Sequence, residues 1–198
     1  MRILYLVFLI SLFLITLPFL GGVSLLVVLT SGCPIFFRQK RVGRDGKIFT
    51  MYKFRTMIPG AETMQKKLHV LNEANGPVFK LHNDPRYTRF GKFLAHTGLD
   101  ELPQLYNVLR GDMALFGPRP LPIAEERKLK AWQKAREQIK PGIISPWILE
   151  GYHKQTFDAW MRSDIDYIKK KSFWYDAGLA GKTVVFLTTL FIRELLQN

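Results

Sequence analysis

Two carboxylic acids stand side by side at Asp100 and Glu101, inside the stretch from Thr97 to Pro120. Adjacent like charges repel each other, and the apolar residues on both sides make ionisation of the pair more costly. We predict a helix that starts at Asp100, which would cap it, and ends near Leu109. Free N–H groups and the positive dipole at a helix start stabilise a carboxylate or a phosphate. The pair therefore suits an anionic nucleophile that attacks a phosphate, with a divalent cation screening the two negative partners.

Positively charged residues lie on both sides of this acid pair in the sequence. Five precede it and two follow it, namely Lys53, Arg55, Arg86, Arg89, Lys92, Arg110 and Arg119. The turn Gly117-Pro118-Arg119-Pro120 is rigid and holds one arginine outward. Arginine suits a phosphate because its planar fork donates two hydrogen bonds. Surface ion pairs are the alternative interpretation for each of these cations.

Short elements of both kinds must position these residues. Residues 34–39 and 48–54 are rich in Phe, Ile and Tyr, and the Asp45-Gly46 turn signal between them predicts a β-hairpin. Helices are expected at 61–74, 91–96, 100–109, 122–140 and 178–196. The fold class is therefore α/β, mostly helical, with one small β-hairpin.

The composition narrows the class of partner. The chain has 198 residues, a formal net charge of +13 and 47% hydrophobic residues. A chain that is both basic and apolar suggests a membrane surface, nucleic acid or a phosphate-rich substrate. Cys33 is the single cysteine, so an intrachain disulfide is excluded and a reducing compartment fits.

The N-terminal segment is apolar and long. No residue from Ile3 to Phe37 carries a formal charge, and about 20 apolar residues suffice to span a bilayer. Pro18 favours a bend, and the cations that begin at Arg38 place this end in the cytoplasm by the positive-inside rule. A cleaved signal peptide, a straight span and a helix that enters and leaves by one face are the three alternatives.

Several separated motifs then resemble a known family, the bacterial sugar transferases, which are monotopic polyprenyl-phosphate phosphoglycosyl transferases. The motifs are Phe36 to Gly43 (FFRQKRVG), Met51 to Met57 (MYKFRTM), Asp84-Pro85-Arg86 with Thr88-Arg89, and nearly all of Leu99 to Pro120. They occur in order along most of the chain. The resemblance implies transfer of a phospho-sugar from a UDP-sugar to polyprenyl (undecaprenyl) phosphate, which releases UMP and begins glycoconjugate assembly.

The resemblance also implies an organisation. Residues 1–33 would form a re-entrant membrane helix broken at Pro18, although the family's usual Ser-Pro pair is Leu17-Pro18 here. Residues 34–198 would form a compact catalytic domain with interfacial helices. This domain would face the cytoplasm at the inner membrane.

Family roles carry over residue by residue. Asp100 would be the nucleophile, forming a covalent aspartyl phospho-sugar, and Glu101 its partner, with both ligating Mg²⁺. The substrate-binding residues would be Lys53, Arg55, Arg86, Arg89, Arg119, Tyr152 and Asp164. Asp112 is either a cap or turn residue or part of the site.

The chain also departs from the family pattern. The differences lie at Ala95-His96, at Ser145-Pro146-Trp147 and at Glu150-Gly151-Tyr152, where relatives carry a phosphate-binding arginine. One alternative is therefore a catalytically weakened relative. Another is a membrane-anchored basic module that binds nucleic acid or acidic lipid, but such a module gives no reason for the acid pair.

The expected partners follow from these interpretations. They are a UDP-sugar, polyprenyl phosphate and a phospholipid membrane, with no nucleic acid; a homodimer is left open. No motif identifies the sugar.

Overall fold

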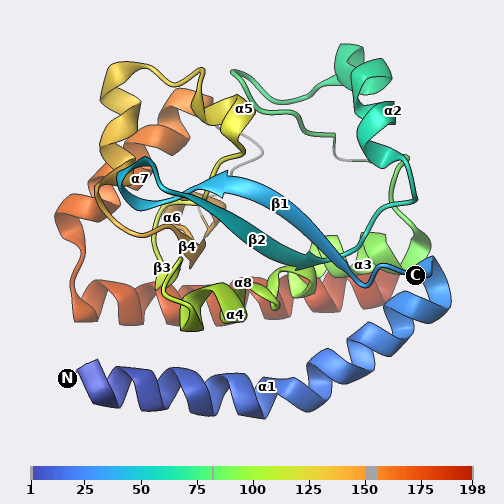
Figure 1. Ribbon diagram of the computed structural model, residues 1–198, viewed down its shortest axis with the longest axis horizontal. Coiled ribbons are helices and arrows are strands. Elements are labelled where there is room, and N and C mark those ends of the chain that lie inside the picture. Colours follow the sequence, from blue (N-terminus) through green and yellow to red (C-terminus); the bar gives the residue numbers. More distant parts are fainter. Residues whose placement is uncertain (1, 82, 150–155, 198) are drawn as a thin grey trace.

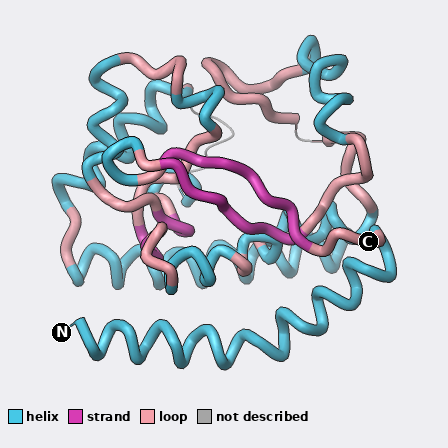
Figure 2. The backbone as a smooth tube through the Cα atoms, viewed as in Figure 1, coloured by secondary structure: helices cyan, strands magenta, loops and turns pink. Residues whose placement is uncertain are grey.

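The computed structural model describes residues 2–81, 83–149 and 156–197. The fold is mostly helical with a small antiparallel hairpin, which confirms the predicted class. Figure 1 shows the hairpin in the middle of the molecule, with the long first and last helices below it and shorter helices above it. The chain is drawn by secondary structure in Figure 2.

The N-terminal helix α1 (Arg2–Ser31) contains Pro18 and is the described segment that is long and apolar enough to cross a membrane. Proline removes one backbone donor and disturbs the preceding turn. Figure 1 shows that α1 is bent but remains one continuous helix. The helix predicted to be broken at Pro18 is therefore bent and not interrupted. Most of its large side chains are exposed, while Leu9, Val23 and Val27 are buried.

The predicted hairpin is confirmed. Strand β1 (Phe36–Val42) pairs antiparallel with β2 (Ile48–Phe54), and the register sets Phe37 opposite Lys53. The connection is the short helix η1 (Arg44–Gly46), in which Asp45 has φ 55° and Gly46 has φ 73°. Asp and Gly adopt this left-handed backbone most readily, which explains the turn at this point.

The predicted basic helix over 122–140 is wrong. This segment forms α5 (Ile123–Glu126) and η4 (Ala131–Gln138), because the backbone of Lys130 is extended, with φ −68° and ψ 155°. The Lys130 amide donates to Gln133 Oε1 at 2.7 Å, which starts a new helix instead of continuing the first. The two pieces connect β3 (Ala114–Phe116) to the parallel strand β4 (Gly142–Ile144), a pairing that the sequence did not predict.

The remaining helices are short, apart from α7 and α8. They are α2 (Ala61–Leu68), η2 (His69–Leu71), α3 (Arg89–Thr97), η3 (Leu99–Glu101), α4 (Gln104–Leu109), α6 (Pro146–Leu149), α7 (Phe157–Lys170) and α8 (Phe173–Gln197). The predicted helix over 61–74 is therefore shorter, and the predicted final helix starts earlier. Asp100 was expected to cap a helix, but it lies inside η3, and Pro103 occupies the cap position of α4 without a side-chain bond.

Candidate active site

The acid pair lies on one tight turn between two helices. Gly98, with φ 72°, ends α3 and starts η3, so Asp100 and Glu101 follow immediately on that turn. Lys53 of β2 places its Nζ 2.6 Å from Glu101 Oε1 and 3.6 Å from Asp100 Oδ2. Arg119 donates to the same Glu101 oxygen at 2.8 Å. The structure thus brings together four predicted site residues from three separate elements.

Asn107 of α4 fixes the strand that carries Lys53. Its amide donates to the Thr50 carbonyl at 2.7 Å, and its Oδ1 accepts from the Tyr52 amide at 3.2 Å. The Asn107 side chain is fully buried, so these bonds form in a dry environment where they hold β2 firmly. Sequence analysis missed this residue, because its partners are about 55 positions away along the chain.

The two acids have opposite electrostatic environments. Burial raises the pKa of Asp100 to about 6, against the attraction of Lys53, and the charge of Glu101 adds to the rise. Burial acts in the same direction on Glu101, but the charges of Arg119 and Lys53 outweigh it and hold that pKa well below its usual range. Glu101 therefore stays ionised, whereas Asp100 titrates closer to neutrality.

Two arginines donate hydrogen bonds to the backbone around Arg119. Arg136 donates to the Arg119 carbonyl, and Arg41 donates to the Pro120 carbonyl at 2.8 Å. Arg136 is in turn paired with Asp164, with nitrogen–oxygen distances of 2.7 and 3.0 Å. Asp164 is fully buried behind the site, so its route to a substrate would run through Arg136 and Arg119.

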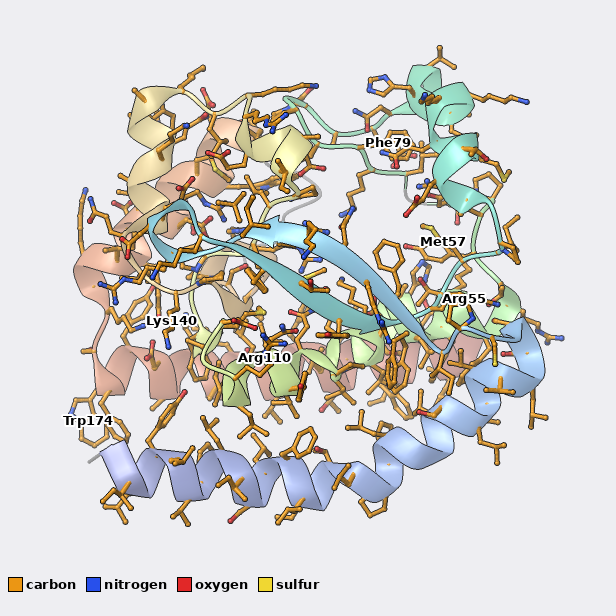
Figure 3. All side chains as sticks on the ribbon, viewed as in Figure 1. Arg55, Met57, Phe79, Arg110, Lys140 and Trp174 are labelled. Carbon is orange, nitrogen blue, oxygen red and sulfur yellow. The ribbon has the colours of Figure 1, made fainter. Side chains whose placement is uncertain are left out.

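The other predicted binding residues lie apart from the acid pair. Arg86 is buried and bonded to Asp84, with an Nε–Oδ1 distance of 2.9 Å. Arg55 donates to the Cys33 carbonyl at 2.6 Å, next to the end of α1, and Figure 3 shows it at that end of the hairpin. Arg89 is exposed and lines a cleft of about 470 Å³ together with Thr30, Phe93 and Glu194.

Two residues that depart from the family pattern, His96 and Trp147, contact side chains of other helices. His96 Nδ1 lies 2.8 Å from Glu194 Oε1, which connects α3 to α8. Trp147 stacks on Trp160 with ring centres 4.8 Å apart. Residues 150–152, including Tyr152, lie outside the described part of the chain.

Asp112 lies beside the bonds that hold the Lys53 strand. Its Oδ2 is 3.4 Å from Arg110 Nε and 3.4 Å from the Asn107 amide. Its contacts are therefore those of a turn residue that supports Asn107.

The acid pair fits the way in which proteins hold magnesium. Mg²⁺ is usually bound by one or two carboxylates together with substrate phosphates and water. Asp100 and Glu101 provide two such carboxylates on one turn. No group of three or more acidic, His or Cys side chains that could hold a metal occurs within residues 2–81, 83–149 and 156–197.

The chain is similar to several curated proteins. The chain is 48% identical to a galactosyl transferase (CpsE) of Streptococcus agalactiae over 73% of its length and 32% of that protein. It is 38% identical to an undecaprenyl-phosphate galactose phosphotransferase of Salmonella typhimurium, covering 79% of this chain and 34% of that one. It is 36% identical to a UDP-glucose:undecaprenyl-phosphate glucose-1-phosphate transferase of Escherichia coli, covering 86% of this chain and 35% of that one.

The chain spans about a third of the length of these curated relatives. The match to the family model called bacterial sugar transferase extends over residues 1–189, which is nearly the whole sequence. The chain therefore belongs to the bacterial sugar transferase family.

Proposed function

We propose that this chain transfers a sugar phosphate from a UDP-sugar to undecaprenyl phosphate and releases UMP. One observation carries the proposal: Asp100 and Glu101 share a turn, and Lys53 and Arg119 meet at one oxygen of Glu101, at 2.6 and 2.8 Å. A partly buried cluster of two acids and two cations is the arrangement that phosphoryl transfer needs. The names of the relatives support both substrates.

The proposed reaction has two displacements. An Asp100 carboxylate oxygen attacks the sugar-linked phosphorus, the bond from that phosphorus to the UMP oxygen breaks, and UMP leaves. An oxygen of the lipid phosphate then attacks the same phosphorus, the bond to Asp100 breaks, and the carboxylate is restored. Dividing the reaction in this way avoids bringing two strongly anionic substrates together in one step.

Lys53 and Arg119 would stabilise charge on the transferring group. Both donate to Glu101 in the structure, at 2.6 and 2.8 Å, and phosphate oxygens of the donor offer them a second acceptor at the same place. Glu101 stays ionised and would help to hold and orient the metal beside the donor. Bound to the two carboxylates, Mg²⁺ would supply positive charge that screens the nucleophile and the diphosphate.

The membrane arrangement is part of the same proposal. A bent, apolar α1 would enter and leave by the cytoplasmic face of the membrane, so that the hairpin and the acid pair remain in the cytoplasm. In a Cys33→Ser background, Arg2→Cys should resist an impermeant thiol reagent added to intact cells. Labelling of this cysteine from outside would contradict the re-entrant arrangement, and Pro18→Leu should increase such labelling by favouring a straight span.

Measurement of UMP release would test the activity. The full chain in detergent or nanodiscs, with undecaprenyl phosphate and Mg²⁺, would be given UDP-galactose, UDP-glucose and UDP-N-acetylgalactosamine in turn. We expect lipid-dependent turnover with at least one of these donors. A folded, membrane-bound protein that releases no UMP from any of them would favour the weakened relative instead.

A further inference from the structure

The junction between α7 and α8 collects three lysines and two aromatic residues. Residues 169–174 read KKKSFW, and all six are exposed. Phe173 and Trp174 are 77% and 81% exposed, and their ring centres lie 5.3 Å apart. The Ser172 hydroxyl accepts from the Tyr175 amide at 3.2 Å, which fixes the turn that carries both rings. Two large aromatic side chains are therefore held at the surface, where their burial would be favourable.

The rest of α8 continues this apolar surface. Phe173, Val184, Phe191 and Leu195 follow one another at intervals of 11, 7 and 4 residues, and all four are exposed. These intervals place side chains on one face of an α-helix. A second row of exposed apolar residues with the same intervals starts at Trp174. The helix therefore presents a broad apolar face along its length, and such a face marks an interaction surface.

The charges of α8 are divided between its two sides. Its two acids, Asp176 and Glu194, face the protein, because Asp176 Oδ1 accepts from the Tyr167 hydroxyl at 2.7 Å and Glu194 contacts the histidine of α3 described above. Its two cations, Lys182 and Arg193, are exposed and lie 11 positions apart, on one side of the helix. The charge that α8 presents outward is therefore positive, like that of the lysines before it.

This surface lies on the same side of the molecule as α1. Figure 1 shows α8 along the lower side, where α1 also runs. Figure 3 labels Trp174 at the lower left, at the same end of the molecule as the first residues of α1. There α1 exposes the apolar side chains of Ile3 and Leu4. Two apolar surfaces on one side of the protein, bordered by cations, fit a single lipid surface.

We propose that residues 169–174 bind anionic phospholipid at the membrane surface, with the lysines at the lipid phosphates and the two aromatic rings among the headgroups. The contact is separate from α1 and rests on the membrane arrangement proposed above for that helix. Aromatic rings favour the headgroup level, and each lysine strengthens binding to an anionic surface about fivefold. Zwitterionic lipid would accommodate the rings but would not attract the lysines, so charge complementarity selects anionic lipid.

Fluorescence quenching by lipid would test the contact. The full chain is reconstituted in vesicles of phosphatidylcholine brominated on its acyl chains, with or without phosphatidylglycerol. Bromine quenches tryptophans that lie in or beside the lipid. Of the four tryptophans, Trp147 and Trp160 are buried and stacked on each other, and Trp132 lies on η4, on the upper side of Figure 1. Trp174→Phe removes the reporter but keeps an aromatic ring, and Trp132→Phe is its matched control.

A second pair of variants tests the lysines. Lys169→Gln with Lys170→Gln removes two charges from the last turn of α7, and Lys66→Gln with Lys67→Gln removes two from the last turn of α2. All four lysines are exposed, and each pair lies where the helix dipole favours a cation. Figure 1 shows α2 on the upper side, away from α1. The two pairs therefore share their local structure and differ in location.

We expect quenching in vesicles with phosphatidylglycerol to be lost in Trp174→Phe and retained in Trp132→Phe. Removal of Lys169 and Lys170 should lower the ratio of lipid-bound to free Trp174 by about 25-fold, about fivefold for each lysine. Quenching should then fall to the level seen without phosphatidylglycerol. The α2 variant should match the unaltered protein.

Flotation of the vesicles separates this proposal from the one for α1. If the chain floats, and Trp174→Phe is quenched as strongly as the unaltered protein, the α8 contact is wrong while the arrangement of α1 stands. Quenching that depends neither on phosphatidylglycerol nor on the lysines would overturn the assignment of anionic lipid. If Trp174 is shielded both from bromine and from acrylamide in the water, a second copy of the chain covers this face and the proposal is wrong. A folded chain that does not float would contradict the arrangement of α1, and the α8 contact would fail with it.

Discussion

Two clusters in this protein hold a buried acid against an arginine, and they differ in solvent access. In the first, the side chains of Asp100, Glu101 and Arg119 are 11%, 17% and 27% exposed. In the second, those of Asp164 and Arg136 are 0% and 5% exposed. Burial raises the pKa of both Asp100 and Asp164 to about 6, so the pKa shift alone does not separate them.

The difference lies in what the arginine can reach. Arg119 donates its side chain to Glu101, which is partly exposed. Arg136 donates inside the protein, from Nε and Nη2 to Asp164 and from the same Nη2 to the Arg119 carbonyl. In the proposed function, the first cluster would exchange a protein partner for a substrate phosphate. The second has no such freedom and holds the first in place.

The largest expected effect comes from removing the charge of one acid in each cluster. Asp100→Asn should lower the rate of UMP release by roughly 10³-fold or more, because an amide cannot act as the nucleophile. Asp164→Asn, which acts only through Arg136, should retain activity within about 10-fold in the folded fraction. Both activities are measured as initial rates of UMP release, divided by the amount of folded protein. Equal losses of activity in the two variants would contradict the distinction between the clusters.

Asp164→Asn should instead have a large effect on stability. Asp164→Asn leaves Arg136 as a buried charge without its carboxylate, so the free energy of unfolding should fall by about 3–5 kcal/mol. Asp158→Asn, which removes the more exposed Lys130–Asp158 pair, should cost about 1 kcal/mol or less. Denaturant unfolding of the detergent-solubilised chain gives both values. A loss for Asp164→Asn no larger than that of the control would contradict its structural role.

Replacement of Arg119 by lysine tests the geometry of the first cluster, that of Asp100, Glu101 and Arg119. Lysine keeps the charge beside Glu101 but lacks the planar fork that can contact an acid and a phosphate together. We expect kcat/KM for the UDP-sugar to fall about 10- to 100-fold, with little change in stability. Steady-state kinetics with donor titration would show it. An Arg119→Lys variant with unaltered kinetics would mean that only the charge matters.

The pH dependence of kcat/KM should be the smallest effect. It should distinguish Asp100 from Glu101. Because the pKa of Asp100 is raised to about 6, its carboxylate gains a proton as the pH falls through that value, and the nucleophile is lost. The pKa of Glu101 is held well below its usual range, so Glu101 remains ionised there. In the range below pH 6, kcat/KM should therefore fall about tenfold per pH unit. A profile that is flat down to pH 4.5 would be inconsistent with this assignment.

Local signals were enough for part of the fold. The Asp45-Gly46 pair predicted the hairpin, because its backbone requirement is met by those two residues alone. The break at Lys130 and the pairing of β3 with β4 were not predicted. The break at Lys130 depends on Gln133, whose side-chain amide donates to Asp158 Oδ1, 25 positions away. The strand pairing depends on Gly142, which approaches Gly117 so closely that a Cβ there would be 2.1 Å from the Gly117 amide nitrogen.

The same limit applies to the site. The acid pair, Lys53 and Arg119 were predicted from motif resemblance, and the structure brings them together. Arg86 and Asp164 are also an arginine and an acid. In the structure, however, Arg86 is buried against Asp84, and Asp164 is buried against Arg136. Sequence alone does not distinguish an arginine that faces a substrate from one that faces a buried aspartate, because the difference is made by long-range packing.

The proposed reaction requires Asp100 to become covalently bonded to the sugar phosphate. Its most direct test gives the enzyme a UDP-sugar and Mg²⁺ without lipid, quenches rapidly, and measures UMP together with the mass of the peptide that contains Asp100. We predict about one UMP per active site and a matching phospho-sugar mass on that peptide, both absent in Asp100→Asn. UMP release that requires lipid, with no adduct at any quench time, would contradict the account.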